Sequence, residues 1–283
     1  MSEQIEKWDL EIHPKNSLLK LNLSEMWHHR DLVLMFVKRD FSTVYKQTIL
    51  GPLWFFIQPI LTTLMFSVVF GSIAKLPTDG IPQVLFYLSG ITIWNYFSDC
   101  LISTSDTFIK NSNIFGKVYF PRLVVPISVV ISNLMKLGVQ MSLFLVVYFY
   151  YLITSDKIHP NSILFLFPLL IVVMGIMGLG SGLIISALTT KYRDLRFLIT
   201  FGVQLLMYAT PVIYPLSSIT SQKRWIMELN PMTAVIETFK YGFLGKGTFS
   251  VMSLVISAVV SILLLLIGVF IFNKVEKKFM DIV

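Results

Sequence analysis

The amino-acid sequence predicts an all-α membrane protein that crosses the bilayer several times. Hydrophobic residues make up 55% of the 283 residues and charged residues only 14%, and the mean hydropathy is +0.73. This composition is too apolar for a soluble domain and is typical of a polytopic membrane protein. Long apolar runs alternate with short polar segments, and a helix needs about 20 mostly apolar residues to cross the hydrocarbon core.

Six windows meet this length and composition, which divides the chain into three regions: a cytoplasmic N-terminal region at 1–49, a six-span domain at 50–273 and a tail at 274–283. The six predicted spans are 50–74, 83–105, 127–153, 163–188, 197–213 and 250–273. The fifth is short, and its continuation ATPVIYPLSS is polar and rich in proline. We therefore expect that helix to end within the outer leaflet, where irregular backbone needs cover from protein or access to water.

The distribution of Lys and Arg predicts the orientation, because basic residues are retained on the cytoplasmic side. Four segments on one side carry three to seven basic residues each: 1–49, 106–122, 189–196 and 274–283. On the other side, 75–82 and 154–162 carry one each and the longer 214–249 carries four. Both termini are therefore expected in the cytoplasm. The net charge of +7 reflects this bias and an affinity for anionic headgroups, so we expect no nucleic-acid binding.

The stretch NLSEMWHHRDLVLMFVKRD before the first span predicts an amphipathic helix. Asn22 and Glu25 have the spacing of a capping box at its start. Apolar residues then recur at three- and four-residue steps, and charged residues and histidines take the other side. Such a helix can lie in the membrane surface or pack on the protein's own cytoplasmic face, and the pattern favours neither.

Two of the connecting segments are long enough for helices of their own. Segment 106–122, DTFIKNSNIFGKVYFPR, has a short amphipathic core and is long enough for one short helix parallel to the membrane, although a plain connector is the alternative. In segment 214–249, Asn230 and Pro231 suit the N-cap and first turn of a helix. An apolar stripe follows: Met232, Val235 or Ile236, Phe239 and Phe243. We expect one or two short re-entrant helices here, dipping partly into the bilayer between spans five and six.

Motifs for catalysis are absent from the sequence. No Walker sequence GxxxxGK[ST] occurs, so the chain cannot hydrolyse ATP by itself. All four histidines lie outside the predicted spans, and the single Cys100 has no metal-ligand neighbours, so we expect neither catalytic residues nor a metal site. Within the spans, the ionisable residues reduce to Asp99 and Lys136. A proton relay or an ion-coupled carrier usually needs more buried charge.

Two local patterns within the spans predict helix contacts. Asn133, Lys136 and Gln140 form a polar stripe that could face a lumen or a polar neighbouring helix. Gly178 and Gly182 have GxxxG spacing, which allows helix backbones to approach closely.

Aromatic residues, 14% of the chain, gather at the ends of the spans. Groups of this kind include Trp54 with Phe55, and Trp94, Tyr96 and Phe97. Most residues at such positions form interfacial belts. Because sugars stack their C–H faces on aromatic rings, the same residues could line a track for a carbohydrate chain.

Three segments carry a resemblance to a known family: YKQTILGPLWFFIQPIL, KYRDLRFLITFGVQLLMYATPVIYP and NPMTAVIETFKYGFLG. In order and spacing they resemble the signature blocks of permease subunits from bacterial polysaccharide ABC exporters of the type 2 ABC family, from about Trp27 to the C-terminus. The resemblance implies six spans in the bacterial inner membrane, a homodimer with the pore on its two-fold axis, and two copies of a separate ATPase. It also implies that the ATPase binds ATP and magnesium and that this chain holds no cofactor.

The resemblance also explains the residues at the start of the first span. Gly51 relaxes the backbone where the amphipathic helix must turn into the membrane, and Pro52 can begin the new helix without losing a hydrogen bond. Pro59 frees a carbonyl next to the polar Gln58. A kinked and partly polar span suits a pore wall, and a simple kink buried between helices is the alternative.

Two groups of site residues follow from this interpretation. The candidate substrate track consists of Trp54, Phe55, Gln58, Tyr208 and Tyr214. The candidate residues for coupling to the ATPase are Asp106, Ile109, Lys110, Phe115 and Lys117. We expect the apolar members of the second group to insert in a cleft of the ATPase, because no span accounts for them.

The resembled family exports lipid-linked O-antigen, capsule or teichoic acid. The leader WDLEIHPKNSLLKLNLSEMW is similar to that of many lipopolysaccharide-type permeases and favours O-antigen. From other classes, the alternatives are a secondary carrier and a membrane-embedded glycosyl-transferring enzyme. The enzyme would need acidic or metal-ligand clusters at a membrane face, and the sequence shows none.

Overall fold

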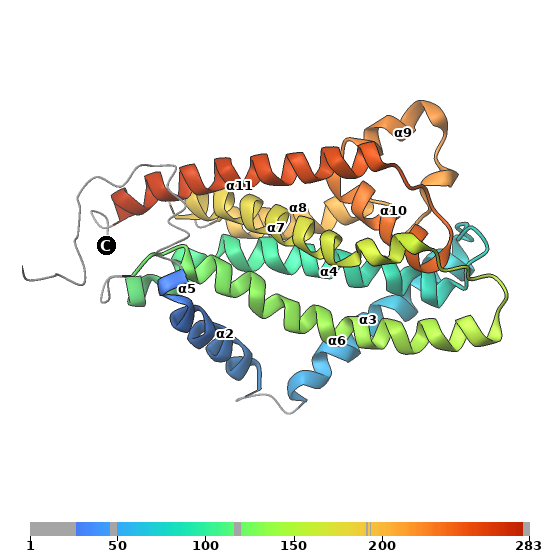
Figure 1. Ribbon diagram of the computed structural model, residues 1–283, viewed down its shortest axis with the longest axis horizontal. Coiled ribbons are helices and arrows are strands. Elements are labelled where there is room, and N and C mark those ends of the chain that lie inside the picture. The colour runs from blue at the N-terminus through green and yellow to red at the C-terminus, as the bar shows by residue number, and fades with distance from the viewer. Residues whose placement is uncertain (1–26, 46–49, 116–119, 191, 193, 280–283) are drawn as a thin grey trace, which may run out of the picture.

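The computed structural model describes residues 27–45, 50–115, 120–190, 192 and 194–279, which form helices and connecting segments without a β-strand (Figure 1). The α-helices are α2 (Arg30–Tyr45), α3 (Trp54–Phe66), α4 (Gln83–Ser105), α5 (Thr107–Phe115), α6 (Val124–Thr154), α7 (Phe167–Thr189), α8 (Leu195–Tyr208), α9 (Ser221–Glu228), α10 (Pro231–Leu244) and α11 (Val251–Phe279). The prediction of an all-α fold is confirmed. The predicted capping box at Asn22 and Glu25 and the candidate coupling residue Lys117 lie outside the described residues.

Within the described ranges, four helical segments are long and apolar enough to cross a membrane: Gly51–Ile73, Val124–Thr154, Ser162–Thr189 and Val251–Val275. They correspond to the first, third, fourth and sixth predicted spans. The second predicted span coincides with α4, which is long enough but more polar. The fifth corresponds to α8, whose 14 residues extend only about 21 Å. Helix α8 ends at Tyr208, before the end of the predicted span at 213, and the ATPVIYP stretch is irregular from Ala209.

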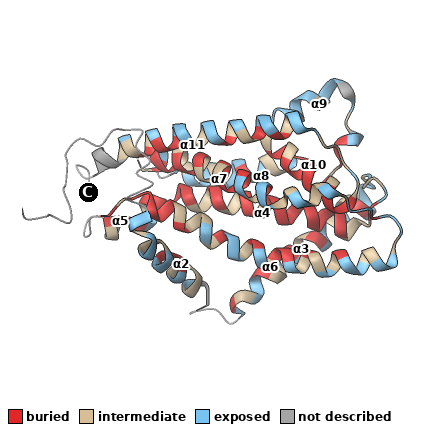
Figure 2. Ribbon diagram, in the orientation of Figure 1, coloured by how far each residue is buried: buried red, intermediate tan, exposed pale blue. Residues whose placement is uncertain are grey.

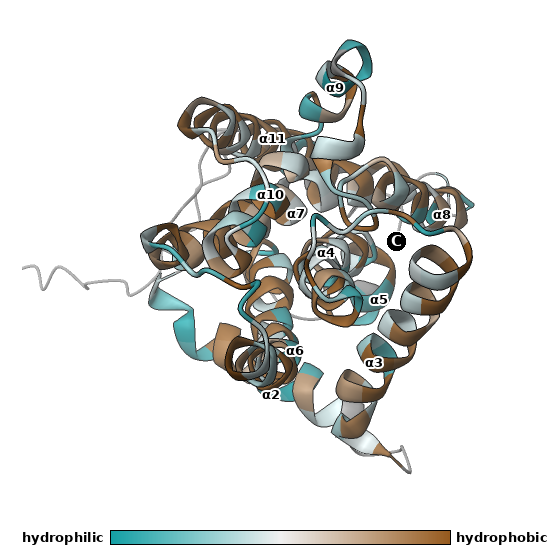
Figure 3. Ribbon diagram, turned by 90° about the vertical axis from the view of Figure 1, so that its right-hand side faces the viewer, coloured by the Kyte–Doolittle hydropathy of each residue, from teal (hydrophilic) through white to brown (hydrophobic). Residues whose placement is uncertain are grey.

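Helix α4 occupies the centre of the bundle, with α3, α6, α7 and α8 around it (Figure 3). Most of its residues are buried, and Figure 2 shows buried residues along its whole length. This burial explains why α4 tolerates polar residues, since its neighbours rather than lipid surround them. Trp94, Tyr96 and Phe97 are each 3% exposed in this core, so the interpretation of these three rings as an interfacial belt is wrong.

Glycines on two faces of α7 let the neighbouring backbones come close. A Cβ on Gly178 would lie 2.7 Å from the Cβ of Cys100 in α4, and one on Gly182 would lie 2.5 Å from the Cβ of Thr104. On another face, a Cβ on Gly180 would lie 2.5 Å from the backbone nitrogen of Leu265 in α11. The predicted close packing at the GxxxG spacing is confirmed.

The chain turns into the first span at Gly51, as predicted. Gly51 has a φ of +47°, a left-handed conformation that glycine adopts without strain. Pro52 follows in a 3-10 turn, Gly51–Leu53, that leads into α3. Helix α3 continues through Pro59 to Phe66 and then widens into a π-helical segment, Ser67–Ile73.

The segment between α8 and α11 contains two short helices, α9 and α10, as predicted. The Asn230 side chain caps α10 by accepting a hydrogen bond from the backbone N–H of Met232 at 3.0 Å, and Pro231 occupies the first turn. The predicted apolar stripe is buried: Met232, Val235, Ile236, Phe239 and Phe243 are at most 5% exposed. We call this end of the bundle the α10 end and the opposite end, where α5 lies, the α5 end (Figure 1).

Candidate functional site at the α5 end

A buried carboxylate joins three helices at the α5 end. Asp106 follows α4 directly, and its side chain is 1% exposed. Its Oδ2 accepts from Lys110 Nζ of α5 at 3.1 Å and from Arg196 of α8 at 3.1 Å. Its Oδ1 is buried and has no hydrogen-bond partner within the described part of the chain. Asp106 therefore ties the helix after the second predicted span to the start of the fifth.

Aromatic rings pack together at the same end of the bundle. We call the buried apolar residues here the α5-end cluster: Phe36, Phe108, Phe115, Phe120, Leu123, Val124, Val125, Leu183, Val269 and Phe272. Phe108 of α5 stacks on Phe272 of α11 with ring centroids 4.6 Å apart, and Phe36 brings α2 into the same cluster. Rings from α2, α5 and α11 therefore belong to one packed cluster, which holds the three helices together at this end.

Phe115 lies in this cluster and not on the surface. Its ring is 3% exposed and packs against Phe108 and Phe120 with centroid distances of 5.9 and 5.8 Å. The expectation that it inserts in a cleft of another protein does not fit this burial, since the chain's own residues surround the ring. Ile109 is half-buried, and Lys110 is exposed. The sequence could not show this, because an apolar loop residue does not reveal what covers it.

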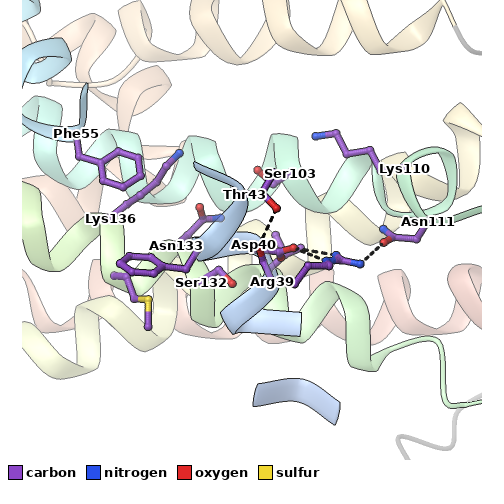
Figure 4. A pocket seen from close by; sticks show the side chains of 13 residues that line it. Arg39, Asp40, Thr43, Phe55, Ser103, Lys110, Asn111, Ser132, Asn133 and Lys136 are labelled. Atoms are coloured by element: carbon purple, nitrogen blue, oxygen red, sulfur yellow. Dashed lines mark hydrogen bonds and ion pairs between the residues drawn. The ribbon is translucent and has the colours of Figure 1, made fainter. Parts of the chain in front are cut away.

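A cavity of about 450 Å³ lies between α2, α4, α5 and α6, next to Lys110, one of the partners of Asp106 (Figure 4). Its polar lining comes from Arg39, Asp40 and Thr43 of α2, Ser103 of α4, Lys110 and Asn111 of α5, and Ser132, Asn133 and Lys136 of α6. Its apolar lining comes from Phe41, Phe55, Val129 and Met135.

Helix α2 packs on the protein's own bundle, through the buried Phe36 and Val37. Leu34 and Met35 of α2 and Trp27 just before it remain exposed, so this part of the chain also offers apolar side chains to its surroundings.

The cationic side chains of the cavity are held in place by polar contacts. Arg39 donates to Asp40 at 2.8 and 3.0 Å and reaches across to Asn111 of α5 at 3.3 Å. Lys136 of α6 pairs with Asp99 of α4 at 3.1 Å. The Arg39–Asp40 pair lies within α2, whereas the Arg39–Asn111 and Lys136–Asp99 contacts each join two helices and so brace the walls of the cavity.

The polar stripe of α6 contacts α4, and its members Asn133 and Lys136 also line the cavity. Next to the Lys136–Asp99 ion pair, the Gln140 carbonyl accepts from Asn95 at 3.4 Å, and the Asn133 amide lies 3.9 Å from the sulfur of Cys100. Of the two interpretations open from the sequence, the polar helix contact is the one that the structure shows.

Comparison with known proteins adds the family to this geometry. The model of the family described as ABC-2 type transporter matches residues 31–244, a region that begins in α2 and ends with α10. The chain belongs to the ABC-2 type transporter family. Among its relatives are two proteins, from Klebsiella pneumoniae and Myxococcus xanthus, both named O-antigen export system permease protein RfbA. The first is 27% identical over 93% of this chain and 98% of its own length. The second is 27% identical over 91% of this chain and 97% of its own length.

The candidate track residues of this ABC-2 transporter chain fall into two separate groups. Trp54, Phe55 and Gln58 lie at the start of α3, whereas Tyr208 and Tyr214 lie at and beyond the far end of α8. Arg196 at the other end of α8 is held at the α5 end by Asp106, so Tyr208 lies toward the α10 end. The Tyr214 hydroxyl donates to the Tyr208 carbonyl at 3.0 Å, which keeps that pair together.

The rings of the two groups also differ in exposure. Trp54 is 48% exposed and Tyr208 is 44% exposed, whereas Phe55 is 8% exposed. The ring centroid of Phe55 lies 5.5 Å from Lys136 Nζ. Gln58 is exposed, and Tyr214 is half-buried. Trp54 and Tyr208 therefore have ring faces available to a ligand, and Phe55 belongs to the cavity wall.

Sequence reasoning missed Arg196, Arg39 and Asn111. Arg196 was counted only as one basic residue of the loop KYRDLR, and Arg39 only as part of the polar face of a helix. A charge in a basic segment predicts orientation, but it does not identify the partner 90 residues away in the chain. Among the described residues, no group of three or more His, Cys, Asp or Glu side chains could hold a metal ion.

A second buried ionic group lies at the α10 end of this family member. Lys240 of α10 is 2% exposed and donates to the carbonyl oxygens of Pro211 at 2.7 Å and Val212 at 3.4 Å. Its Nζ lies 3.6 Å from the ring centroid of Phe86 in α4. Burial lowers the pKa of Lys240 to about 7, and the nearby Glu237 and Asp79 oppose that shift. Lys240 therefore fastens α10 to the irregular segment that follows α8.

Proposed function

We propose that this chain is the membrane-spanning permease subunit of an ATP-driven exporter that moves lipid-linked polysaccharide, most specifically O-antigen, across the bacterial inner membrane. The observation that carries the proposal is the similarity to O-antigen export permeases over 93% of this chain and 98% of the relative. The match includes α2, α5 and α10, which lie outside the apolar spans. Capsule and teichoic acid permeases of the same family are the alternatives for the substrate.

The proposed topology has six spans with both termini in the cytoplasm. Four segments have the length and hydropathy of spans. We add α4, because it runs alongside α6 and α7 through the centre of the bundle, and α8, because α9 and α10 continue beyond its end (Figure 1). In this arrangement the α5 end faces the cytoplasm and the α10 end faces outward, with α9 and α10 as short re-entrant helices. The basic segments then lie on the cytoplasmic side.

The proposed energy source is a separate ATPase, with two copies bound to a homodimer of this chain. ATP and magnesium would bind to that ATPase, since this sequence lacks a Walker motif. The α5 end supports the proposal, because Lys110 on α5 is exposed while Asp106 links the helix to α8. Asp106, Ile109, Lys110, Phe115 and Lys117 remain the candidate coupling residues. For the buried Phe115, the proposed role is to hold α5 against the cluster.

Reconstitution with and without the partner tests this function. We expect the purified chain in lipid vesicles to show no ATP hydrolysis above the background of empty vesicles. Addition of the ABC ATPase encoded in the same genome should give hydrolysis that lipid-linked polysaccharide stimulates. A catalytically inactive ATPase variant is the control. Turnover by the permease alone, or polymer movement driven by an ion gradient without the ATPase, would contradict the proposal and favour an enzyme or a secondary carrier.

A further inference from the structure

The cavity between α2, α4, α5 and α6 has the chemistry of a phosphate-binding site. Its lining carries three cationic side chains, from Arg39, Lys110 and Lys136, and one carboxylate, from Asp40. Asp99 and Asp106 pair with the two lysines from outside the lining. Each of the three cations thus has a carboxylate partner, and Arg196, which shares Asp106, leaves the group of four cations and three carboxylates with an excess of one positive charge. A volume of about 450 Å³ is within the range of small-molecule sites, roughly 300–1,000 Å³.

Each cation retains donors toward a ligand. A lysine ammonium has three N–H groups and an arginine guanidinium has five. The Lys136 ammonium pairs with Asp99 and lies over the ring of Phe55, and the Lys110 ammonium pairs with Asp106, so each has N–H groups left for a ligand. On the same wall of α6, the Ser132 hydroxyl already donates to the Ser128 carbonyl at 2.8 Å, so the neutral donor left for a ligand is the second N–H of the Asn133 amide. The cations and this amide together can surround the oxygens of a phosphate, which has no proton to donate when fully ionised.

The position of the cavity points to a phosphate carried on a lipid. Phe55, which lies in the first turn of α3, is part of its wall, so the cavity lies at the level where the first span enters the membrane. Phospholipid headgroups occupy that level. Val129 and Met135 extend an apolar surface from the polar lining along α6, which runs on through the membrane. A ligand with a charged head and an apolar chain fits both parts of this wall.

We propose that this cavity binds the phosphate headgroup of a membrane lipid, with Arg39, Lys110 and Lys136 as its ligands. Two lipids can supply this phosphate. One is the phosphate-bearing lipid anchor of the exported polymer, and that assignment rests on the proposed function. The other source of the same chemistry is an anionic phospholipid of the bilayer. In either case α2 and α5, whose side chains line the cavity, contact the bound headgroup directly.

Binding to the full-length chain in neutral detergent micelles tests the site. The probes are a short-chain prenyl diphosphate, phosphatidylglycerol and the zwitterionic phosphatidylcholine, each titrated while thermophoresis or native mass spectrometry reports binding. We expect the anionic lipids to bind, with an affinity that falls as salt rises, and phosphatidylcholine to bind much more weakly. The variant Lys136→Gln should weaken binding of the anionic lipids about tenfold.

A matched pair of variants separates a binding role from a structural one. Lys136→Gln and Asp99→Asn both break the same ion pair, so a purely structural role predicts the same direction of change for both. A binding role predicts opposite directions, because Asp99→Asn frees the amine and should tighten binding. Arg39→Gln and Asp40→Asn form a second pair with the same logic. Lys223→Gln, which changes an exposed cation of α9, should leave binding unchanged.

The outcomes distinguish the two sources of the phosphate, and they separate the proposed binding site from the proposed export function. Tighter binding of the prenyl diphosphate supports the site and assigns it to the anchor of the polymer, while equal binding of phosphatidylglycerol supports the site and assigns it to bulk lipid. Equal affinity for phosphatidylcholine, or unchanged affinity in Lys136→Gln and Arg39→Gln, overturns it. Because this assay needs neither ATPase nor transport, its failure leaves the export function standing. A failure of reconstituted export likewise leaves the binding result intact.

Discussion

The two ends of the bundle each contain a buried ionic group, and they satisfy it differently. At the α5 end, Asp106 pairs with Lys110 and Arg196, whose side chains are 55% and 47% exposed. At the α10 end, Lys240 is enclosed with two backbone carbonyls and the face of an aromatic ring. Its acidic neighbour Glu237 is also buried and accepts from the backbone N–H of Thr248 at 2.8 Å.

This difference indicates which end can rearrange. An ion pair with a half-exposed partner contributes about 0–1 kcal/mol, because water can replace the partner. A buried charge that loses its partners costs about 3–5 kcal/mol. Asp106 is itself buried, but two exposed cations share it, so either one can leave at small cost while the other keeps the carboxylate paired. The enclosed contacts of Lys240 instead hold α10 and the segment after α8 in one arrangement. A coupling end that changes and an outer end that stays assembled fit the proposed transport.

The largest effect is expected from removing the buried lysine. Lys240→Ala would leave the Pro211 carbonyl without its donor and Glu237 without a nearby positive charge. We expect the free energy of unfolding to fall by about 3–5 kcal/mol, measured as a lower thermal midpoint in detergent. Lys223→Ala on the exposed face of α9 is the control, with an expected change within about 0.5 kcal/mol. Equal midpoints for the two variants would show that the α10 end is not fixed by this lysine.

The sequence predicted those parts of the fold that depend on local patterns. Hydropathy located four of the helices that can span a membrane, the Asn230–Pro231 pair located the start of α10, and the spacing of Gly178 and Gly182 identified a close helix contact. In each case the physical cause lies within a few residues: length of apolar chain, a cap, or a missing side chain.

The contacts that define the candidate site could not be predicted in this way. Asp106 meets Arg196 across 90 residues of sequence, and Lys240 meets the carbonyl of Pro211 only because α10 folds back on the segment after α8. Phe115 was assigned to a partner protein because no predicted span needed it, yet the ends of several helices together form its pocket. Such contacts depend on how the helices assemble.

An intermediate effect is expected at the α5 end. Asp106→Asn keeps the size of the side chain and removes the charge that Arg196 and Lys110 share. We expect the thermal midpoint to change little, by the equivalent of about 1 kcal/mol, and ATP-driven export to fall clearly, because α5 and α8 would no longer move together.

A double-mutant cycle with Arg196→Gln sharpens this comparison. If the ion pair carries the coupling, the double variant should export no worse than either single variant. Lys110→Gln is the matched control, because Lys110 lies on α5 itself and ties that helix only to the end of α4. We expect a smaller loss for Lys110→Gln than for Arg196→Gln. Additive losses in the cycle would show that Asp106 and Arg196 act separately.

The smallest effect is expected from the two exposed rings, Trp54 at the start of α3 and Tyr208 at the end of α8. Trp54→Leu and Tyr208→Leu keep apolar surface but remove the flat ring face on which a sugar can stack. Because one stacking contact contributes about 0.5–1.5 kcal/mol, each change should reduce export only a few-fold, with normal expression and assembly. The double variant should lose more, since a sliding polymer would touch both rings in succession.

Phe55→Leu separates a substrate track from ordinary packing. Phe55 is next to Trp54 in the chain, but its ring is buried against Lys136, so no sugar can stack on it. If the track interpretation is correct, Phe55→Leu should alter the thermal midpoint and leave the polymer length dependence of export unchanged, whereas Trp54→Leu should do the reverse. If Trp54→Leu and Tyr208→Leu export at the original rate, or fail only because the protein no longer inserts, these rings anchor the spans at the membrane surface and the polymer follows another path.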